Sequence, residues 1–443
     1  MNLKFKRFMS IMMLLMAVMA FTACQKVDNG AANESAEAGT TASKAQFETL
    51  KDGEDFHIGI VTGTVSQSED EFRAAEKAVE TYGSADEGGI IKHDTYPDRF
   101  EAEQETTISK IVAMADDPLM KAVIVNQSVP GTSAAFTQIR EKRPDILLVN
   151  LVAQEDTVMV ENTSDLVVDA DNVSRGYRII QAAKDMGATK FAHITFPRHM
   201  SIELLALRRA IMEEACKDLG LEFISLNAPD PTTDIGVPGA QQYVAENIQP
   251  WIDKYGKDTA FFCTNDAHTE PLLRGVAAGG AIFVEQDLPS PIMGYPKAFS
   301  VDIKDMAGDW QAINSAVEKA VIEKGGDKRM GTWAYSLGYS VTLGALDHIM
   351  EVLKGNSEIT DRDKLIAAIE SHTEGAKWMA ENYVDRASGE TKDNHILVSQ
   401  DTYVYGRGYL GMDKVEVPEK YLNLNVDLDA IKASQESAEG QAE

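Results

Sequence analysis

The chain has 443 residues, with 70 Asp and Glu against 42 Lys and Arg, which gives a formal net charge of −28. This acidity excludes nucleic acid as a partner, because phosphate binding requires clustered basic side chains, and it argues against a polybasic membrane-surface protein. Hydrophobic residues make up 44% of the chain and charged residues 25%, as in folded soluble proteins. At roughly 150 residues per domain, the length predicts two or three domains.

The first 23 residues have the pattern of an export signal. A basic segment at residues 4–7 precedes an apolar run at 8–21, which is shorter than the roughly 20 apolar residues that a membrane span needs. The run ends in Phe-Thr-Ala-Cys, which resembles a bacterial lipobox. Residues 1–23 are therefore predicted to be removed and Cys24 to carry a lipid such as palmitate. This predicts an extracytoplasmic protein anchored to the cell membrane; an ordinary secretory signal with an incidental Cys24 is the alternative.

Short apolar runs alternate with amphipathic helical patterns from about residue 56 to 286, in two series of similar length. The first series predicts strands at 58–61, 90–91, 122–125, 146–150 and 166–168, and the second at 190–195, 223–226 and 259–263. The first helix is expected to open on a capping box formed by Ser68 and Glu71. Continuous apolar strands separated by amphipathic helices indicate parallel sheets covered on both faces. The sequence therefore predicts an α/β protein with two similar lobes.

Composition and pattern divide the chain into four parts. After the signal at 1–23, a polar stretch rich in Ala, Gly, Ser and Thr predicts a flexible tether at 24–50. The N-terminal lobe is assigned residues 51–166 plus about 290–350, and the C-terminal lobe residues 167–289 plus about 351–430. Helices are expected at 336–353 and 363–371. Residues 384–424 show no clear period and receive no predicted element.

Four features together resemble the type I periplasmic solute-binding family, in the form of a lipoprotein component of an ABC transporter from a poorly characterised branch. They are the lipoprotein start, the opening strand His57–Gly63, the segment Val168–Tyr177, which is similar to that family's crossing between lobes, and the run Ala260–Asp266, which ends in Asn-Asp. The resemblance covers roughly residues 55–350. It implies two doubly wound parallel-sheet lobes joined by a hinge, with a ligand cleft between them.

Polar residues follow the predicted strands, and open α/β sheets bind ligands at the carboxyl ends of their strands. The candidates are Thr62, Thr64, Ser66, Gln67, Asn126, Gln127, Ser128 and Asn150 in the first lobe and Phe196, Arg198, Arg208, Asn265, Asp266 and Tyr295 beyond it. Neutral amides and hydroxyls suit an uncharged or zwitterionic polar ligand. The aromatic rings offer a face to a sugar or a base, the acid an acceptor for hydroxyls or an ammonium, and the arginines a partner for a carboxylate.

Several of these residues also have a purely structural interpretation. Asn126 and Asn265 are of a type common in turns and caps, and Asp266 could cap the helix that follows it. Arg208 could lie on a solvated helix face. Cys216 and Cys263 fit buried thiols that act as small apolar residues.

The leading hypothesis is a lipid-anchored solute-binding protein that captures a nucleoside, sugar or amino acid between its lobes and delivers it to an ABC permease. No catalytic residue, cofactor or metal site is nominated, because the chain lacks a nucleophile elbow, a His-Glu-x-x-His helix and a Walker loop. The His-x-Glu at 268–270 offers too few ligands for a metal. The alternative is a surface sensor or adhesion lipoprotein that uses the same fold without transport.

Overall fold

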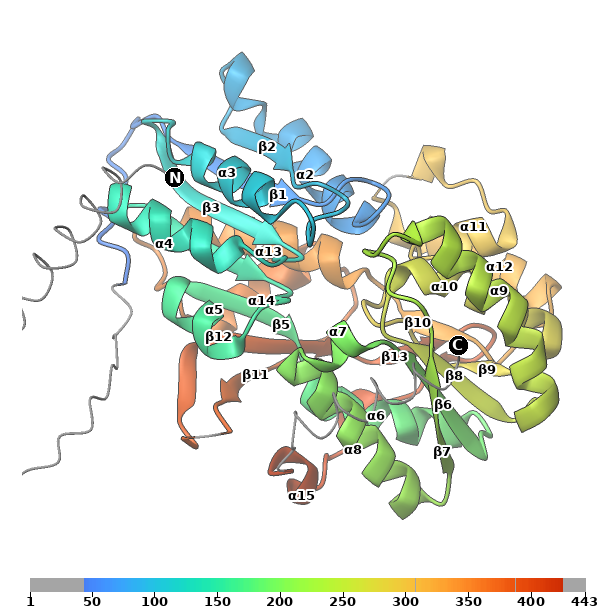
Figure 1. Cartoon of the computed structure of the whole chain (residues 1–443). Coiled ribbons are helices and arrows are strands. Elements are labelled where there is room, and N and C mark those ends of the chain that lie inside the picture. The colour runs from blue at the N-terminus through green and yellow to red at the C-terminus, as the bar shows by residue number, and fades with distance from the viewer. Residues whose placement is uncertain (1–43, 307, 387, 425–443) are drawn as a thin grey trace, which may run out of the picture. The chain divides into compact units, whose positions relative to one another are not determined.

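A computed structural model describes residues 44–424, except 307 and 387; the predicted signal and Cys24 lie outside these residues. The larger of its two main sheets pairs neighbouring strands in parallel, except at one edge, where the last two strands are antiparallel (Figure 1). Its strand order is β11 (Trp378–Val384), β12 (Thr391–Gln400), β5 (Leu166–Ala170), β4 (Leu147–Leu151), β3 (Met120–Asn126), β1 (His57–Thr62) and β2 (Ile91–Thr95).

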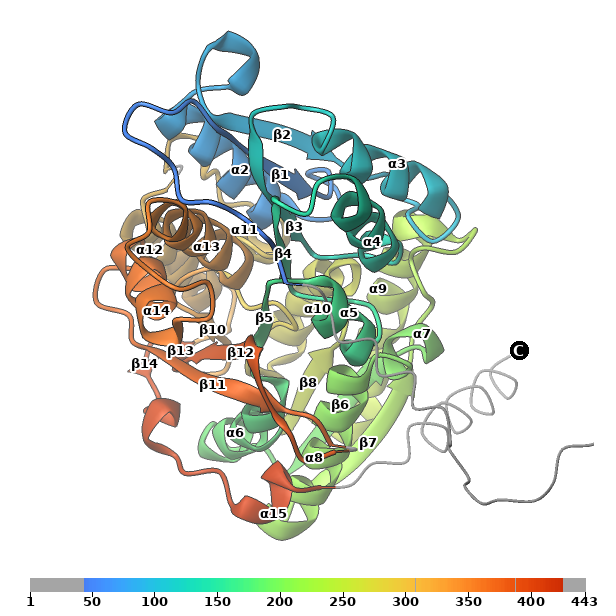
Figure 2. The same cartoon turned by 90° about the vertical axis from the view of Figure 1, so that its left-hand side faces the viewer.

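Helices cover both faces of this first sheet (Figure 2). On one face lie α2 (Glu69–Tyr82), α13 (Leu337–Leu353) and α14 (Arg362–Ser371), and on the other α3 (Gln104–Met114), α4 (Thr132–Lys142) and α5 (Thr157–Thr163). Successive side chains of a strand point to opposite faces. Accordingly, Ile58 and Ile60 of β1 pack in the cluster that contains Ala75 of α2, whereas Val61 packs with Phe136 of α4. Both faces of the central strands are covered, so β3, β4 and β5 are nearly continuous hydrophobic runs.

The second sheet repeats the plan on a smaller scale. Its four parallel strands are, in order, β7 (Glu222–Asn227), β6 (Lys190–Thr195), β8 (Thr259–Cys263) and β9 (Ile282–Phe283). Its helices are α6 (Asn172–Asp185), α7 (Pro197–Met200), α8 (Glu203–Leu219), α9 (Gly236–Tyr255) and α10 (Asp266–Gly279). Phe191 and Phe262 pack with the residues of α6 and α8, and Ile194 and Phe261 with those of α9 and α10. Gly176 of α6 allows the close approach of α8, because a Cβ there would lie 2.8 Å from Ile211.

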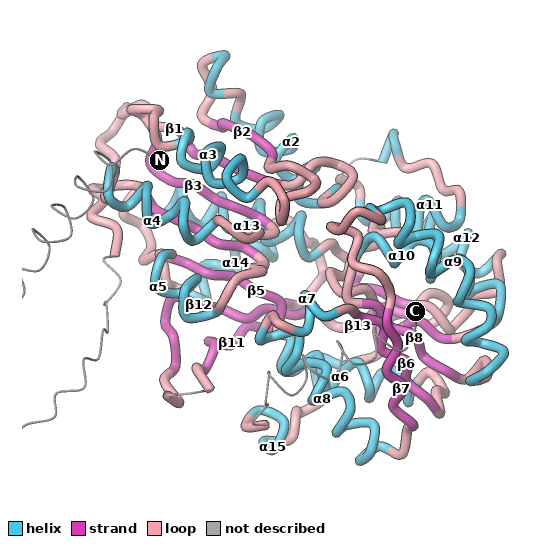
Figure 3. Tube along the Cα trace, in the orientation of Figure 1, coloured by secondary structure: helices cyan, strands magenta, loops and turns pink. Residues whose placement is uncertain are grey.

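The rest of the chain adds further elements to both lobes (Figure 3). Its elements, with one short helix after α2, are η1 (Ala85–Glu87), α11 (Tyr295–Phe299), η2 (Lys304–Met306), α12 (Trp310–Glu323), β10 (Gly331–Trp333), β13 (Thr402–Val404), β14 (Gly408–Tyr409), η3 (Met412–Lys414) and α15 (Glu419–Leu422). Strands β10, β13 and β14 form a small antiparallel sheet. The chain crosses between the sheets at residues 170–172, 333–337 and 400–402, which together form the hinge region.

The structure confirms the predicted α/β class and its two parallel-sheet lobes. Each predicted strand overlaps an observed one, and the predicted helices at 336–353 and 363–371 correspond to α13 and α14. Cys216 and Cys263 are buried and unpaired, as expected. Their burial raises the pKa of both thiols to about 12.

Two expectations differ from the structure. Part of the segment 351–430, assigned by its sequence pattern to the C-terminal lobe, forms β11 and β12, and β12 pairs with β5 of the first sheet because Ile396 and Val398 are buried there. Within 290–350, α13 packs on α2 of the first lobe, but α11 packs on α10 of the second.

The second difference concerns the predicted capping box at the start of α2. The side chain of Ser68 accepts no hydrogen bond from the helix, and its Oγ lies 3.3 Å from the hydroxyl of Tyr96. Glu71, the other member, is only 1% exposed. Its carboxylate lies against α13, where a Cβ on Gly338 would be 2.1 Å from Oε1. Glu71 is therefore held by a neighbouring helix and takes no part in capping its own.

Candidate functional site

The carboxyl ends of both main sheets meet at a small polar cavity of about 60 Å³. The first lobe contributes residues that follow β3, β4 and β5, and the second lobe residues that follow β6, β8 and β9. Among those that line it are Gln127, Gln154, Asn172, Thr264, Asn265 and Asp287. Loops far apart in the sequence thus converge on one place between two sheets, as ligand sites in doubly wound folds do.

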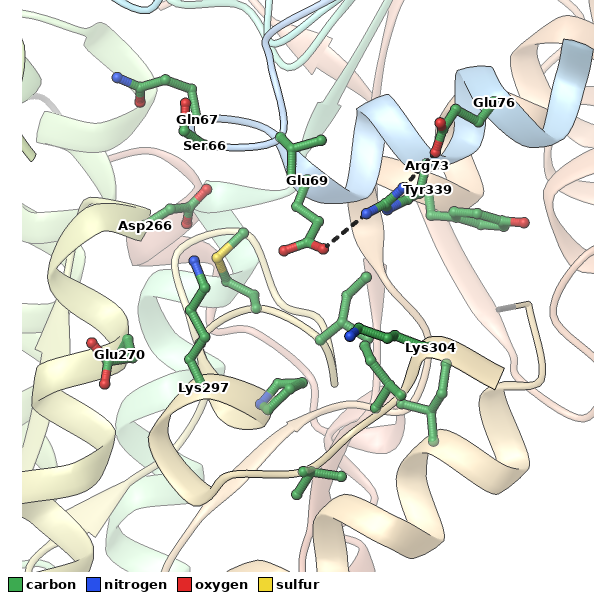
Figure 4. Close-up of a pocket in the computed structure, with 18 of the residues that line it drawn as sticks. Ser66, Gln67, Glu69, Arg73, Glu76, Asp266, Glu270, Lys297, Lys304 and Tyr339 are labelled. Carbon is green, nitrogen blue, oxygen red and sulfur yellow. Dashed lines mark hydrogen bonds and ion pairs between the residues drawn. The ribbon is translucent and has the colours of Figure 1, made fainter. Parts of the chain in front are cut away.

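A larger cavity of about 720 Å³ lies beside α2, between that helix and the segment 292–313 (Figure 4). Its lining includes Trp310, Ile313 and Tyr339, which belong to one hydrophobic cluster and which we call the apolar wall. Figure 4 shows charged side chains around the rest of the cavity, among them Asp266 from α10 and Lys297 from α11. Asp266 lines both cavities, so they meet at this residue. The volume of the larger cavity is in the range that small-molecule sites have, roughly 300–1,000 Å³.

The structure brings six of the fourteen candidate residues to these cavities. Ser66, Gln67 and Asp266 line the larger cavity, and Gln127, Arg208, Asn265 and again Asp266 line the smaller one. Asn265, and not Asp266, caps α10, because its Oδ1 accepts a 2.9 Å hydrogen bond from the backbone N–H of Ala267. The acid is therefore left free of the capping role that its position in the sequence suggested.

Four first-lobe candidates make internal hydrogen bonds and line neither cavity. The Thr62 hydroxyl donates to the carbonyl of Gly63 at 2.8 Å, and the Thr64 hydroxyl bonds Asp98. Asn126 donates to Thr342 of α13 at 2.7 Å, and Ser128 to the carbonyl of Val125 at 2.8 Å. These residues shape the loops at the strand ends.

The remaining candidates lie in the core or bridge the lobes. Asn150 and Phe196 are fully buried and line neither cavity. Tyr295 is also fully buried, and its hydroxyl donates to the carbonyl of Gly331 at 2.6 Å, so it offers no face to a ligand. Arg198 forms a 2.7 Å ion pair with Asp230 and reaches across to Gln154 of the first lobe at 3.4 Å.

Arg208 is completely buried, contrary to the solvated helix face that its position suggested. It donates to Asn172 Oδ1 at 2.8 Å and forms an ion pair with Asp287. Its guanidinium also lies over the ring of Phe262, 4.8 Å from the centroid. Because the charges of Arg208 and Asp287 compensate each other, the pair gives the smaller cavity polar groups but no net charge.

The hinge region is held by a buried set of residues that we call the hinge cluster: Arg175, Glu285, Trp333 and Thr402. Glu285 is 2% exposed and accepts hydrogen bonds from Arg175 Nε at 2.9 Å, Trp333 Nε1 at 3.2 Å and Thr402 Oγ1 at 2.9 Å. These donors come from three separate segments of the chain. One carboxylate therefore ties together the segments at which the chain crosses between the sheets.

Asp266, which lines both cavities, and the nearby acids Asp70 and Glu71 have no basic partner within the described residues, and we call the three the cleft carboxylates. Asp70 accepts a 2.5 Å hydrogen bond from the hydroxyl of Ser336. Burial raises the pKa of Asp70 to about 6 and, with the charge of Asp70, that of Glu71 to about 8. Burial also raises the pKa of Asp266 well above its usual range, and the charges of Asp287, Glu71 and Asp70 raise it further. Only Asp266 was a candidate from the sequence, because the other two appeared to be first-turn acids of a helix.

The buried His395 contacts a residue that lines the smaller cavity. His395 of β12 lies 3.1 Å from Glu161 and 2.9 Å from Asp169, and Asp169 lines that cavity. Burial alone would lower the pKa of His395, but the two carboxylates outweigh it and raise this pKa. This contact could not be predicted, since the sequence pattern indicates no element around residue 395.

The fold is that of a two-lobed α/β protein and is similar to the fold of type I periplasmic binding proteins. The chain belongs to the family described as "Protein of unknown function (DUF3798)", which it matches over residues 56–331. Two uncharacterised proteins of Treponema pallidum (strain Nichols) are 44% and 38% identical over 180 and 212 residues. These alignments cover 40% and 48% of this chain and 81% and 96% of the relatives.

Solved structures also match this chain. A "Putative transcriptional regulator" from Clostridium difficile 630 is 24% identical with a TM-score of 0.64, covering 80% of this chain and 99% of that one. An ABC transporter periplasmic solute binding protein from Actinobacillus succinogenes 130z, with bound D-allose, is 15% identical with a TM-score of 0.45, covering 68% and 93%. In the described part of the chain, no helix has the length and apolar character needed to cross a membrane.

Proposed function

We propose that the protein is an extracytoplasmic solute-binding lipoprotein that captures a small polar molecule between its two lobes. The observation that carries the proposal is the convergence of strand ends from both sheets on the smaller cavity. Such a site is completed only when the lobes approach each other, because neither lobe alone supplies all of its walls. A ligand that contacts both lobes therefore favours the closed arrangement by its differential affinity for the two states.

The binding groups available to such a ligand are directional and mostly neutral. Gln127 and Gln154 approach from the first lobe, and Thr264 and Asn265 from the second. Amides and hydroxyls both donate and accept hydrogen bonds, so they select a ligand by the pattern of its polar groups. A ligand with a different pattern of polar groups leaves buried protein groups without hydrogen bonds and therefore binds less tightly.

The proposed role includes attachment to the cell membrane through a lipid on Cys24 and delivery of the ligand to an ABC permease. The lipobox-like sequence supports the first of these. Replacement of Cys24 by Ala should abolish labelling by a palmitate analogue and release the protein from membranes. Unchanged labelling and membrane association in that variant would contradict the anchor.

The binding role is tested on the full chain purified in detergent. Small molecules released by denaturation are identified by mass spectrometry, and thermal shifts are recorded with sugars, nucleosides and amino acids. A ligand that raises the melting temperature and protects loops of both lobes from hydrogen exchange supports the proposal. A protein that releases no small molecule and shows no shift with any compound tested contradicts it.

A further inference from the structure

The acidic side chains buried near the boundary between the lobes differ in whether a basic side chain pairs with them. Arg175 is paired with Glu285, and Arg208 with Asp287. The cleft carboxylates are the exception: within the described residues, none of them has a Lys, Arg or His nitrogen within the 4 Å of an ion pair. An isolated buried carboxylate is costly, as are like charges placed together, so such an acid either holds its proton or takes a cationic partner.

Each cleft carboxylate also has one oxygen without a hydrogen-bond partner. These atoms are Oδ1 of Asp70, Oε2 of Glu71 and Oδ1 of Asp266. Asp70 is 3% exposed and Glu71 is 1% exposed, so bulk water does not solvate them. The other oxygen of Glu71 accepts a 3.4 Å hydrogen bond from Gln127, which lines the smaller cavity. Of the three acids, only Asp266 lines the cavities, and it lines both, so its unpartnered oxygen is the one that a ligand can reach.

We propose that Asp266 binds the positively charged group of a small organic cation, with Asp70 and Glu71 as nearby acids and the body of the ligand on the apolar wall of the larger cavity. This inference rests on the proposed solute-binding function and names its ligand class. An ammonium or amidinium group donates hydrogen bonds, which the unpartnered oxygen of Asp266 accepts. Among the described residues, no group of three or more His, Cys, Asp or Glu side chains has a metal-binding arrangement, which favours an organic cation over a metal ion.

The apolar wall gives such a ligand a second point of recognition. Trp310 and Tyr339 stand in edge-to-face contact, with ring centroids 5.1 Å apart, and both line the larger cavity. A flat or aliphatic body placed there gains burial, while its charged end reaches Asp266. Small-molecule sites commonly combine such an apolar surface with a few polar groups that fix orientation.

Lys297 is the competing cation within this cavity. It is exposed, and Figure 4 shows its ammonium pointing from α11 towards the side where Asp266 and Glu69 lie. It forms no ion pair within the described residues, so Asp266 remains available. Removal of the Lys297 charge should therefore strengthen the binding of a cationic ligand.

The test compares cations with neutral molecules of the same shape, by calorimetric titration of the full chain in detergent. The pairs are benzamidine with benzamide and putrescine with butane-1,4-diol, and ribose and glucose represent neutral sugars. Cations are expected to bind at least about tenfold more tightly than their neutral partners, since close charge pairs contribute more than about 1.4 kcal/mol. Asp266→Asn should remove that preference, and Lys297→Met should increase cation affinity a few-fold.

Two further variants keep the result interpretable. Asp253→Asn changes an exposed acid on α9 and should leave cation affinity unchanged. If Asp266→Asn fails to fold, Glu71→Gln should likewise weaken cation binding.

Three outcomes would overturn the inference. Equal affinity for a cation and its neutral partner excludes charge recognition, and an unchanged affinity in Asp266→Asn excludes this site. Sugar binding without any cation binding shows the ligand class to be wrong while the receptor function stands. If none of the six probes binds, nor any compound of the three solute classes, the proposed function falls as well.

Discussion

The single carboxylate of the hinge cluster and the three cleft carboxylates differ in what surrounds each acid. In the hinge cluster, Glu285 accepts three hydrogen bonds, one of them from an arginine. Among the cleft carboxylates, Glu71 accepts one long hydrogen bond from an amide and keeps an oxygen unpartnered. A compensated buried charge holds segments together, whereas an uncompensated one lowers stability and is retained where binding requires it.

The largest effect is expected from breaking the hinge cluster. Glu285→Ala leaves the guanidinium of Arg175 buried without its carboxylate, and the loss of one partner of a buried pair costs roughly 3–5 kcal/mol. The free energy of unfolding from a denaturant titration measures this loss. Thr402→Val removes a single hydroxyl donor and should cost about 1 kcal/mol. Equal losses in the two variants would show that the charge pair does not dominate the cluster.

Substitution of a cleft carboxylate is expected to raise the free energy of unfolding and not to lower it. Glu71→Gln keeps the size of the side chain and removes a buried negative charge, so the protein without ligand should become more stable by about 1 kcal/mol or more at pH 8.5. The same denaturant titration measures the gain. A loss of stability would show that Glu71 is compensated within the chain, and the contrast with Glu285 would disappear.

The pH dependence of stability sharpens the same contrast. A folded-state pKa of Glu71 raised from 4.5 to about 8 means that the folded protein binds more protons than the unfolded chain between these values. The free energy of unfolding should therefore fall as pH rises through this range. Asp70, Asp266 and His395, whose pKa values are also raised, act in the same direction.

Buried histidines complicate the acid side of this range. The lowered pKa values of His193, His199 and His268 have the opposite effect below about pH 6.5. Stability is therefore compared from about pH 7 to 8.5, in the wild type and in Glu71→Gln. A smaller slope is expected in the variant, and identical slopes would contradict the assignment.

A smaller effect is expected at the contact between the lobes. Arg198 pairs with Asp230 and lies over the rings of Phe100 and Phe196, with centroid distances of 5.7 and 5.3 Å. Because this arginine is partly exposed, Arg198→Met should cost about 1 kcal/mol of stability. Hydrogen exchange should increase in the loop around Gln154, which Arg198 contacts. An unchanged exchange rate would show that this contact does not hold the lobes together.

The sequence predicted the two-lobed fold because continuous apolar strands between amphipathic helices are a local signal. It also led to Asp266 and Gln127, since both follow strands. It did not lead to Glu71, whose place in the first turn of a helix is typical of an exposed acid. The contact that buries Glu71 comes from Gly338, 267 positions further along the chain, and no local pattern reports it.

The last part of the chain was the least predictable. Strand β12 has polar residues at both ends and only a short apolar centre, so it lacks the signal of a buried strand. Its place in the sheet depends on β5 and β11, which lie on either side of it. The roles of Glu161, Asp169 and His395 follow from that pairing alone and could not be derived from spacing.

The position of β12 has a consequence for how this protein is made. Because residues 391–400 pair directly with β5, the first lobe cannot complete its sheet until nearly the whole polypeptide has been synthesised. Until then β5 presents an open edge with unpaired backbone groups, the kind of surface that recruits other chains. The late synthesis of this strand keeps the sheet of the first lobe incomplete until residues 391–400 have left the ribosome.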